Sequence, residues 1–307
     1  CYHHKHPSFR RKQMSITLKN ERIELHFDLP QEHYQASRFD WTGKIQHVLF
    51  DGIPLSVSEK NDVDADENLY GKGFYNEFGI DTALGFEEAG IGDWFHKIGI
   101  GLLRKNESDY FFHKDFEIKP AAFSVSSFHD RIEISCISEL VNGYAYQLSK
   151  TIKLLEDGFL ISYQLTNTGE KEIVTDEYIH NFLALHSNHK SVNHRLKFPF
   201  PVSIEIRSGN LHPEHAELGH DYLHLHKSPE KEFFYNHLSK AEKVRGKWEL
   251  TDHNKNIGLS ETTDFEVSKV NLWGSAHVIS PELFHHIRVS PGASTNWTRI
   301  YRIFKTN

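Results

Sequence analysis

The sequence has little of several features that would define a class of protein. It contains only two cysteines, Cys1 and Cys136, which are too few for a disulfide framework. No apolar run approaches ~18 residues, so we expect no membrane span. Basic residues are not in excess, because the net charge is -7 at pH 7. A nucleic-acid surface needs a basic face, and we therefore expect no nucleic-acid partner.

Several catalytic motifs are also missing. The sequence has no G-x-G-x-x-G, no phosphate-binding G-x-x-x-x-G-K and no G-x-S-x-G, so nucleotide-dependent and serine-hydrolase chemistry have no support. No H-E-x-x-H occurs among the 23 histidines, and none has zinc-motif spacing with cysteines. His224 and His226 share a strand face and could form a chance metal site, but solvated or core histidines are the favoured interpretation. We expect no metal and no cofactor.

What the sequence does contain is alternating apolar and polar segments rich in aromatic residues, with 22 Phe, 12 Tyr and 5 Trp. Segments such as R-I-E-I-S-C-I-S and F-L-I-S-Y-Q-L-T recur roughly every 10 to 14 residues and are separated by turn residues, which is typical of a sandwich. The pattern predicts an all-β fold, a large two-sheet antiparallel β-sandwich. Residues 53–93 lack steady periodicity, and we expect them to form an ordered loop over one sheet face.

Residues 1–13 precede Met14, the only methionine, and show no strand or helix period. We expect them to lie outside the core and residues 14–307 to form a single β-sandwich domain. If Met14 is the natural start, a cytoplasmic location is favoured. The alternative is that Cys1 is a processed N-terminus, which would suit a periplasmic or lipid-anchored protein.

The stretch T-D-E-Y-I-H-N-F-L-A-L, residues 175–185, places one histidine among apolar and aromatic neighbours. Strand alternation puts Tyr178, His180 and Phe182 on one face and Glu177 and Asn181 on the other. A histidine between two aromatic residues on one face is either a packed core residue or part of a ligand pocket.

Other polar residues lie at the ends of β segments and are candidates for a binding site. They are Arg38, the neighbours His96 and Lys97, and Glu282. Each also has an ordinary explanation, because Arg38 could pair with a surface acid, Lys97 could be a solvated strand charge, and Glu282 could be an exposed turn residue after Pro281.

Taken together and in this order, these segments resemble the galactose mutarotase-like (aldose 1-epimerase) superfamily. The segment Y-I-H-N-F resembles the family's histidine segment, and Glu282 with the following V-S-P-G-A-S and W-T-R-I-Y-R-I-F resembles its C-terminal segment. The resemblance extends from about Ser15 to the end of the chain. The Asn-Arg pair and the H-G-G-type loop of characterised galactose mutarotases are absent. No residue matches the family's sugar-binding aspartate, since Asp252 falls on the wrong side of its strand.

The resemblance implies a β-sandwich with an open cleft, in which His180 is the general acid and Glu282 the general base. Trp273 would lie near a sugar-contacting position, and either Trp94 or Trp273 would cover an apolar sugar face. Arg38, His96 and Lys97 would donate hydrogen bonds to hydroxyls or an acidic substituent of the substrate.

The implied activity is that of an aldose 1-epimerase (mutarotase), which interconverts the α and β anomers of a free sugar or sugar derivative by acid/base ring opening. If the two catalytic groups flank a pyranose ring, their reactive atoms should be roughly 5–9 Å apart. A non-catalytic carbohydrate-binding protein on the same fold is the main alternative. A glycoside hydrolase would normally need a second carboxylate, and a polysaccharide lyase would need a longer groove.

Overall fold

The computed structural model describes residues 16–62, 64–186 and 191–306 of the chain. The described residues are nearly all in strands or loops, with one short 3-10 helix, η1 (Glu67–Leu69), and no α-helix. No helix in this part of the chain is long and apolar enough to cross a membrane. The N-terminal extension predicted at residues 1–13 lies outside the described residues.

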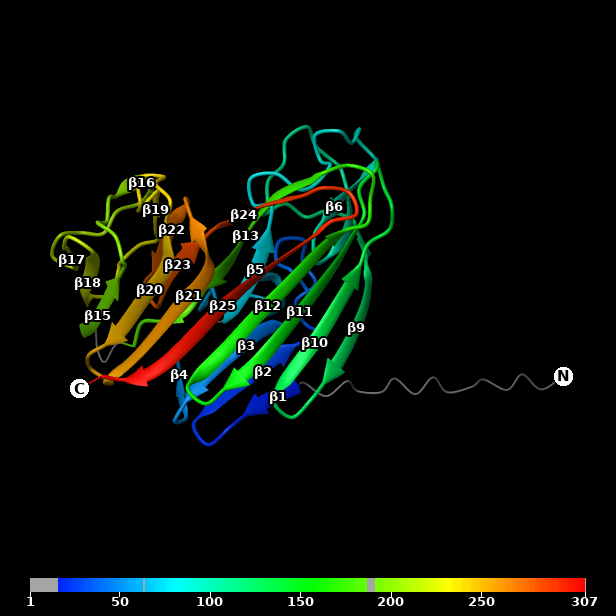
Figure 1. The fold of residues 1–307 in the computed structure, drawn as a ribbon. Coiled ribbons are helices and arrows are strands. Elements are labelled where there is room, and N and C mark those ends of the chain that lie inside the picture. The colour runs from blue at the N-terminus through cyan, green and yellow to red at the C-terminus, as the bar shows by residue number, and fades with distance from the viewer. Residues whose placement is uncertain (1–15, 63, 187–190, 307) are drawn as a thin grey trace.

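The described residues form four antiparallel sheets, and three of them build the main body (Figure 1). The ten-stranded sheet has the order β17 (Ala216–Leu218), β18 (Tyr222–Lys227), β15 (Ser191–Lys197), β20 (Val244–Asp252), β21 (Ile257–Val267), β25 (Ser294–Lys305), β12 (Gly158–Asn167), β11 (Tyr146–Leu155), β10 (Arg131–Ile137) and β9 (Ala122–Ser127).

The remaining sheets are smaller. The seven-stranded sheet has the order β1 (Ile16–Lys19), β2 (Ile23–Asp28), β3 (Lys44–Phe50), β5 (Phe74–Phe78), β13 (Ile173–Asn181) and β24 (His285–Val289), with β4 (Ile53–Pro54) paired to β3. The five-stranded sheet has the order β14 (Leu183–Ala184), β23 (Val278–Leu283), β22 (Val270–Ser275), β19 (Phe233–Asn236) and β16 (Glu205–Ser208). A three-stranded sheet contains β6 (Trp94–Lys97), β7 (Gly101–Arg104) and β8 (Ile118–Pro120).

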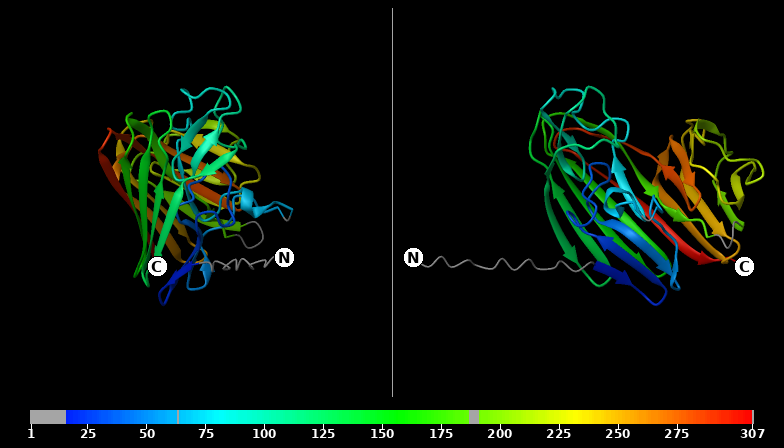
Figure 2. Two further views of the ribbon diagram at one scale, coloured as in Figure 1. Left: turned by 90° about the vertical axis from the view of Figure 1, so that its right-hand side faces the viewer. Right: turned by 180° about the vertical axis from the view of Figure 1, so that it is seen from behind.

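The core lies between the ten-stranded sheet and the two sheets that face it. Figure 2 shows the arrangement of these sheets from two further sides. Phe74 on β5 packs against Phe159 on β12 and Tyr301 on β25, with ring centroids 5.3 and 5.0 Å apart. Residues of β11 are alternately buried and partly exposed, as their apolar-polar alternation predicts. Cys136 is buried on β10. The predicted all-β sandwich is confirmed.

One part of the predicted loop at residues 53–93 is wrong. Residues 74–78 form β5, a strand inside the seven-stranded sheet between β3 and β13. All five of its residues are buried, so both faces of the strand are covered. A strand covered on both faces has no reason to alternate polar and apolar residues, which is why the period-2 signal failed here.

The seven- and five-stranded sheets meet at a junction that two segments of the chain cross. Each segment forms a strand of one sheet and then a strand of the other. β13 leads into β14 through Phe182, and β23 leads into β24 through Phe284. β13 pairs with β24 on one side of this junction, and β14 pairs with β23 on the other. Between the two ladders lies a short stretch in which these strands run side by side without a regular ladder.

The ladders on the two sides of this junction have the same register. Glu177 is opposite His285 before it, and Leu183 is opposite Ile279 after it. Counting inward from either side places His180 opposite Glu282. The fold therefore brings the two predicted catalytic residues together as cross-strand neighbours.

Candidate active site

His180 and Glu282 lie in contact at the junction of the two sheets. The distance from His180 Nε2 to Glu282 Oε1 is 3.4 Å, and both side chains are buried. They line a cleft of about 320 Å³, together with Arg38, Tyr178, Phe234 and Trp273. This volume is at the lower end of the range of small-molecule sites.

Aromatic rings enclose the imidazole of His180. The Phe182 ring stacks on it with centroids 4.0 Å apart, and Trp273 and Phe39 meet it edge-on at 5.1 and 6.1 Å. Tyr178, on the same strand face, stacks on Phe284 across the junction at 4.4 Å. The predicted alternation of this stretch therefore agrees with the structure, with Tyr178, His180 and Phe182 on the cleft side.

A side-chain hydrogen bond replaces the missing ladder beside the pair. The Asn181 amide nitrogen donates to the carbonyl oxygen of Pro281 at 2.7 Å, which joins the residue after His180 to the residue before Glu282. Pro281 has no N–H group to donate to a ladder, so an irregular pairing at this position is expected. Asn181 thus helps to fix the spacing between the two candidate catalytic residues.

On the face of β13 opposite the cleft, the fully buried Arg299 joins the same strands. Its Nη2 donates to the Glu177 carboxylate at 2.7 Å and to the Leu283 carbonyl at 3.0 Å, and its Nη1 donates to Glu261 at 2.6 Å. Asn181 also donates to Glu261, at 3.3 Å. One guanidinium therefore connects β13 and β23 from behind the candidate site.

Arg38 enters the cleft from the segment between β2 and β3 and is held by acidic and phenolic partners. Its Nε lies 3.0 Å from Glu77 Oε2, its Nη2 donates to the Tyr178 hydroxyl at 3.2 Å, and its Nη1 is 3.8 Å from Glu59. The Tyr178 hydroxyl also donates to Glu77, at 2.7 Å. Arg38 and Tyr178 are therefore fixed in the wall by a buried carboxylate.

Two predicted substrate-binding residues are not among the residues that line this cleft. Lys97 Nζ contacts Glu77 at 3.2 Å and donates to Tyr110 at 2.8 Å, behind the wall that Arg38 forms. His96 is buried and packs edge-on against Tyr146, with ring centroids 5.9 Å apart. Both lie on β6 of the three-stranded sheet, which places them in the protein interior. Their positions differ from the predicted one, and Lys97 reaches the site only through Glu77.

The buried environment shifts the proton affinities of the pair in opposite directions. Burial raises the pKa of Glu282 from 4.5 to about 8, although the Arg38 charge acts against this shift. Burial, with the Arg38 charge in addition, lowers the pKa of His180 well below its ordinary value. These opposite directions favour the arrangement in which Glu282 is protonated and His180 is neutral. Transfer of that proton across the 3.4 Å contact would produce a carboxylate beside an imidazolium.

Some residues of the site were missed by sequence reasoning. Glu77 lies in the segment predicted to be a loop, so its role was hidden together with strand β5. Arg299 was part of the quoted W-T-R-I-Y-R-I-F segment but carried no signal of its own, because its partners are far away in the chain. Tyr178 was placed on the face of His180 by alternation, and that signal could have identified it.

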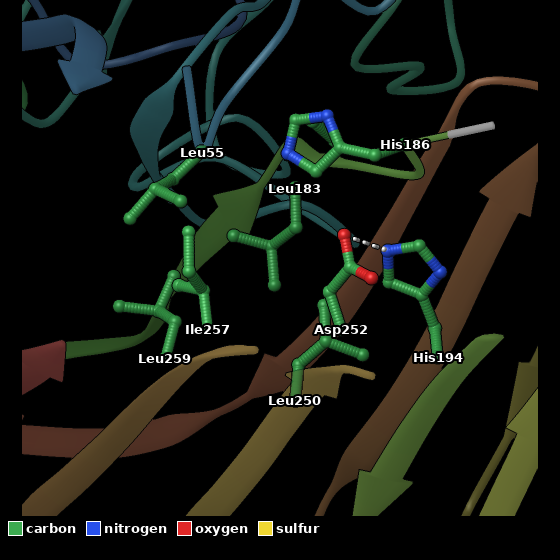
Figure 3. Close-up of a pocket in the computed structure, with 9 residues that line it drawn as sticks. Leu55, Leu183, His186, His194, Leu250, Asp252, Ile257 and Leu259 are labelled. Carbon is green, nitrogen blue, oxygen red and sulfur yellow. Dashed lines mark ion pairs between the residues drawn. The ribbon is translucent and has the colours of Figure 1, made fainter. Parts of the chain in front are cut away.

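A second, much smaller cavity lies apart from the cleft (Figure 3). It has about 30 Å³ of space, compared with about 320 Å³ for the cleft. Its wall is mostly leucine and isoleucine, with His194 Nε2 3.5 Å from Asp252 Oδ2. Asp252 is therefore engaged here and does not line the cleft of His180, and the cavity is too small for a sugar.

Comparison with solved structures supports the fold assignment. A galactose mutarotase-like protein from Lactobacillus casei shares 13% identity over 95% of this chain and 100% of its own, with a TM-score of 0.59. An Escherichia coli K12 protein, provisionally named an aldose 1-epimerase, has a TM-score of 0.63 at 13% identity, covering 95% of this chain and 99% of its own. The Slr1438 protein from Synechocystis sp. PCC 6803 has a TM-score of 0.62 at 12% identity, with 96% of each chain covered.

The predicted resemblance to galactose mutarotase-like proteins is thus confirmed at the level of the fold. No protein-family model matches the chain, and no curated protein sequence matches it either.

Proposed function

We propose that this protein is an aldose 1-epimerase, which interconverts the α and β anomers of a free sugar or sugar derivative by acid/base ring opening. The observation that carries the proposal is the direct contact of His180 and Glu282, 3.4 Å apart in a cleft that Trp273 and Arg38 also line. A buried carboxylate beside a buried imidazole can exchange protons with a bound hydroxyl group. The names given to two proteins of similar fold, galactose mutarotase-like protein and aldose 1-epimerase, agree with this chemistry.

The distance of 3.4 Å is shorter than the 5–9 Å expected for groups on opposite sides of a ring. The chemistry explains how the shorter distance can serve. Ring opening removes the proton of the anomeric O1 and delivers a proton to the ring oxygen, and both oxygens are bonded to the same carbon. Two neighbouring groups can therefore reach both oxygens from one side of the sugar.

In this mechanism the pair first passes its proton from Glu282 to His180. The Glu282 carboxylate then takes the O1 proton while the His180 imidazolium protonates the ring oxygen. After rotation about C1–C2, the carbonyl is attacked on its other face and the two roles reverse. The Arg38 charge favours the carboxylate form of Glu282 but opposes the imidazolium form of His180, so the proton transfer within the pair is the step that the bound sugar must assist. Arg38 can donate to a sugar hydroxyl, and Trp273 can cover an apolar sugar face.

The pH dependence follows from the need for one shared proton. Glu282 loses that proton above about pH 8, and His180 binds a second one only well below pH 6.5. We expect kcat/KM for mutarotation, which reports the free protein, to be level through neutral pH and to fall above about pH 8. The measurement is a pH series with the buffer-catalysed rate subtracted. A fall in kcat/KM as the pH rises through about 6.5, where an ordinary imidazole titrates, would contradict the shared-proton mechanism.

An NMR mutarotation assay over a panel of free aldoses tests the function itself. Faster equilibration of a freshly dissolved anomer than in buffer alone supports the epimerase. If the protein binds an aldose but accelerates none of them, it is a carbohydrate-binding protein on this fold.

A further inference from the structure

A group of potential metal ligands lies at the end of the ten-stranded sheet, in strands β17 and β18 (Figure 1). Glu217 on β17 is the cross-strand partner of His224 on β18, and His226 follows two residues later on the same face. One ligand atom from each of the three residues lies within 4.8 Å of the others. Leu223 and Leu225, which alternate with the two histidines along β18, are buried, so the three polar side chains lie on the outer face of the sheet.

Two neighbouring side chains already orient these ligands. The Tyr222 hydroxyl donates to Glu217 Oε1 at 2.8 Å, and Glu217 Oε2 faces His226 Nε2 at 4.0 Å. Asn193 Oδ1 lies 2.8 Å from His224 Nε2 and can accept a hydrogen bond from the Nε2–H group. That contact favours the tautomer of His224 in which Nε2 carries the hydrogen and the lone pair of Nδ1 is available to a metal ion. Such outer partners of the ligating groups are a usual part of protein metal sites.

We propose that Glu217, His224 and His226 form a binding site for one divalent transition-metal ion. Two imidazoles and a carboxylate are a donor set that suits zinc, cobalt, nickel or copper and leaves at least one position for water. His224 and His226 alone would be a chance pair, and the cross-strand Glu217 adds the third ligand. Because Glu217 comes from a three-residue edge strand, the ion would tie β17 to β18.

The competing group Asp28, Glu32 and His33 is a weaker candidate. Lys44 Nζ lies 3.4 Å from Asp28 and already supplies a positive charge to that carboxylate. Within the described residues, the only ion pair of Glu217 is with His226.

The test measures Zn²⁺ affinity on the full chain by competition with a chromophoric chelator, and Co²⁺ binding by visible absorption. Cys1, His3, His4 and His6 are potential competing ligands by sequence. The measurements are therefore made in a background carrying Cys1→Ser, His3→Ala, His4→Ala and His6→Ala.

In this background we expect one Zn²⁺ per chain, with affinity reduced at least ~10-fold by His224→Ala, His226→Ala or Glu217→Gln. The Co²⁺ absorption bands should be lost in the same variants, and the Zn²⁺-dependent rise in melting temperature should disappear with them. The control His129→Ala removes a histidine whose side chain is 94% exposed. His129 lies in the turn between β9 and β10, at the edge of the ten-stranded sheet opposite β17. Absence of Zn²⁺ binding in the background protein, or equal affinity in the three variants and the control, would overturn the proposal.

Discussion

Glu282→Gln should reduce mutarotation by ~100-fold or more while the protein stays folded. Glutamine has nearly the shape of glutamate and keeps its hydrogen-bonding capacity, but it can neither take the O1 proton nor share one with His180. His180→Asn should reduce the rate similarly, because it removes the other half of the pair. The measurement is the rate of anomer equilibration by NMR on a sugar that the wild-type protein turns over.

The same substitution should make the protein more stable at alkaline pH. The pKa of Glu282 is about 8 in the folded protein, above its ordinary value of 4.5. The folded state therefore binds this proton more tightly than the unfolded state does. The stability that this difference contributes is fully present below pH 4.5 and is lost as the pH rises to about 8. The loss is on the order of 3–5 kcal/mol at most. Glutamine has no such loss, so the melting-temperature difference between Glu282→Gln and wild type should grow from pH 5 to 8.

Glu232→Gln is a matched control, because Glu232 is another carboxylate that lines the cleft but is exposed. Its replacement should change the rate far less than that of Glu282. Normal folding and wild-type rates in both Glu282→Gln and His180→Asn would show that the catalytic pair is assigned wrongly. Equal losses in Glu282→Gln and Glu232→Gln would show that Glu282 has no special role.

The fold was predictable because most strands have one face toward the core. β10, β11 and β12 alternate buried and more exposed residues, and their sequence shows it directly. β5 does not alternate because it is covered on both sides, and no local pattern distinguishes such a strand from an ordered loop. The error at β5 also hid Glu77, which holds Arg38 and Tyr178 in the cleft wall.

Of the six predicted site residues, four line the cleft, namely Arg38, His180, Trp273 and Glu282, but the sequence did not predict their geometry. Family resemblance selected His180 and Glu282, yet only the shared register of two ladders places them opposite each other. The positions of His96 and Lys97 depend on how the three-stranded sheet packs against the main body, and the short segment that carries them contains no information on this. The third ligand of the proposed metal site, Glu217, likewise becomes visible only through strand pairing.

Arg299→Leu should destabilise the protein by about 3–5 kcal/mol, because it leaves two buried carboxylates without their cation. Glu177 and Glu261 are both fully buried and within 2.7 Å of the guanidinium. Burial already raises the pKa of Glu177, and the Arg299 charge opposes this shift. The measurement is the free energy of unfolding from urea denaturation. The folded fraction should also lose mutarotase activity, since Arg299 joins the strands that carry His180 and Glu282.

Arg302→Leu is the matched control on the same strand, because Arg302 is exposed and pairs with Asp157 at the surface. It should change stability little, since exposed ion pairs contribute little. Adding Glu177→Gln and Glu261→Gln to Arg299→Leu should recover part of the lost stability, because the uncompensated charges are then gone. If Arg299→Leu is as stable as Arg302→Leu, the buried network does not hold the two strands together. If the triple variant is no more stable than Arg299→Leu, the loss comes from packing and not from the unpaired carboxylates.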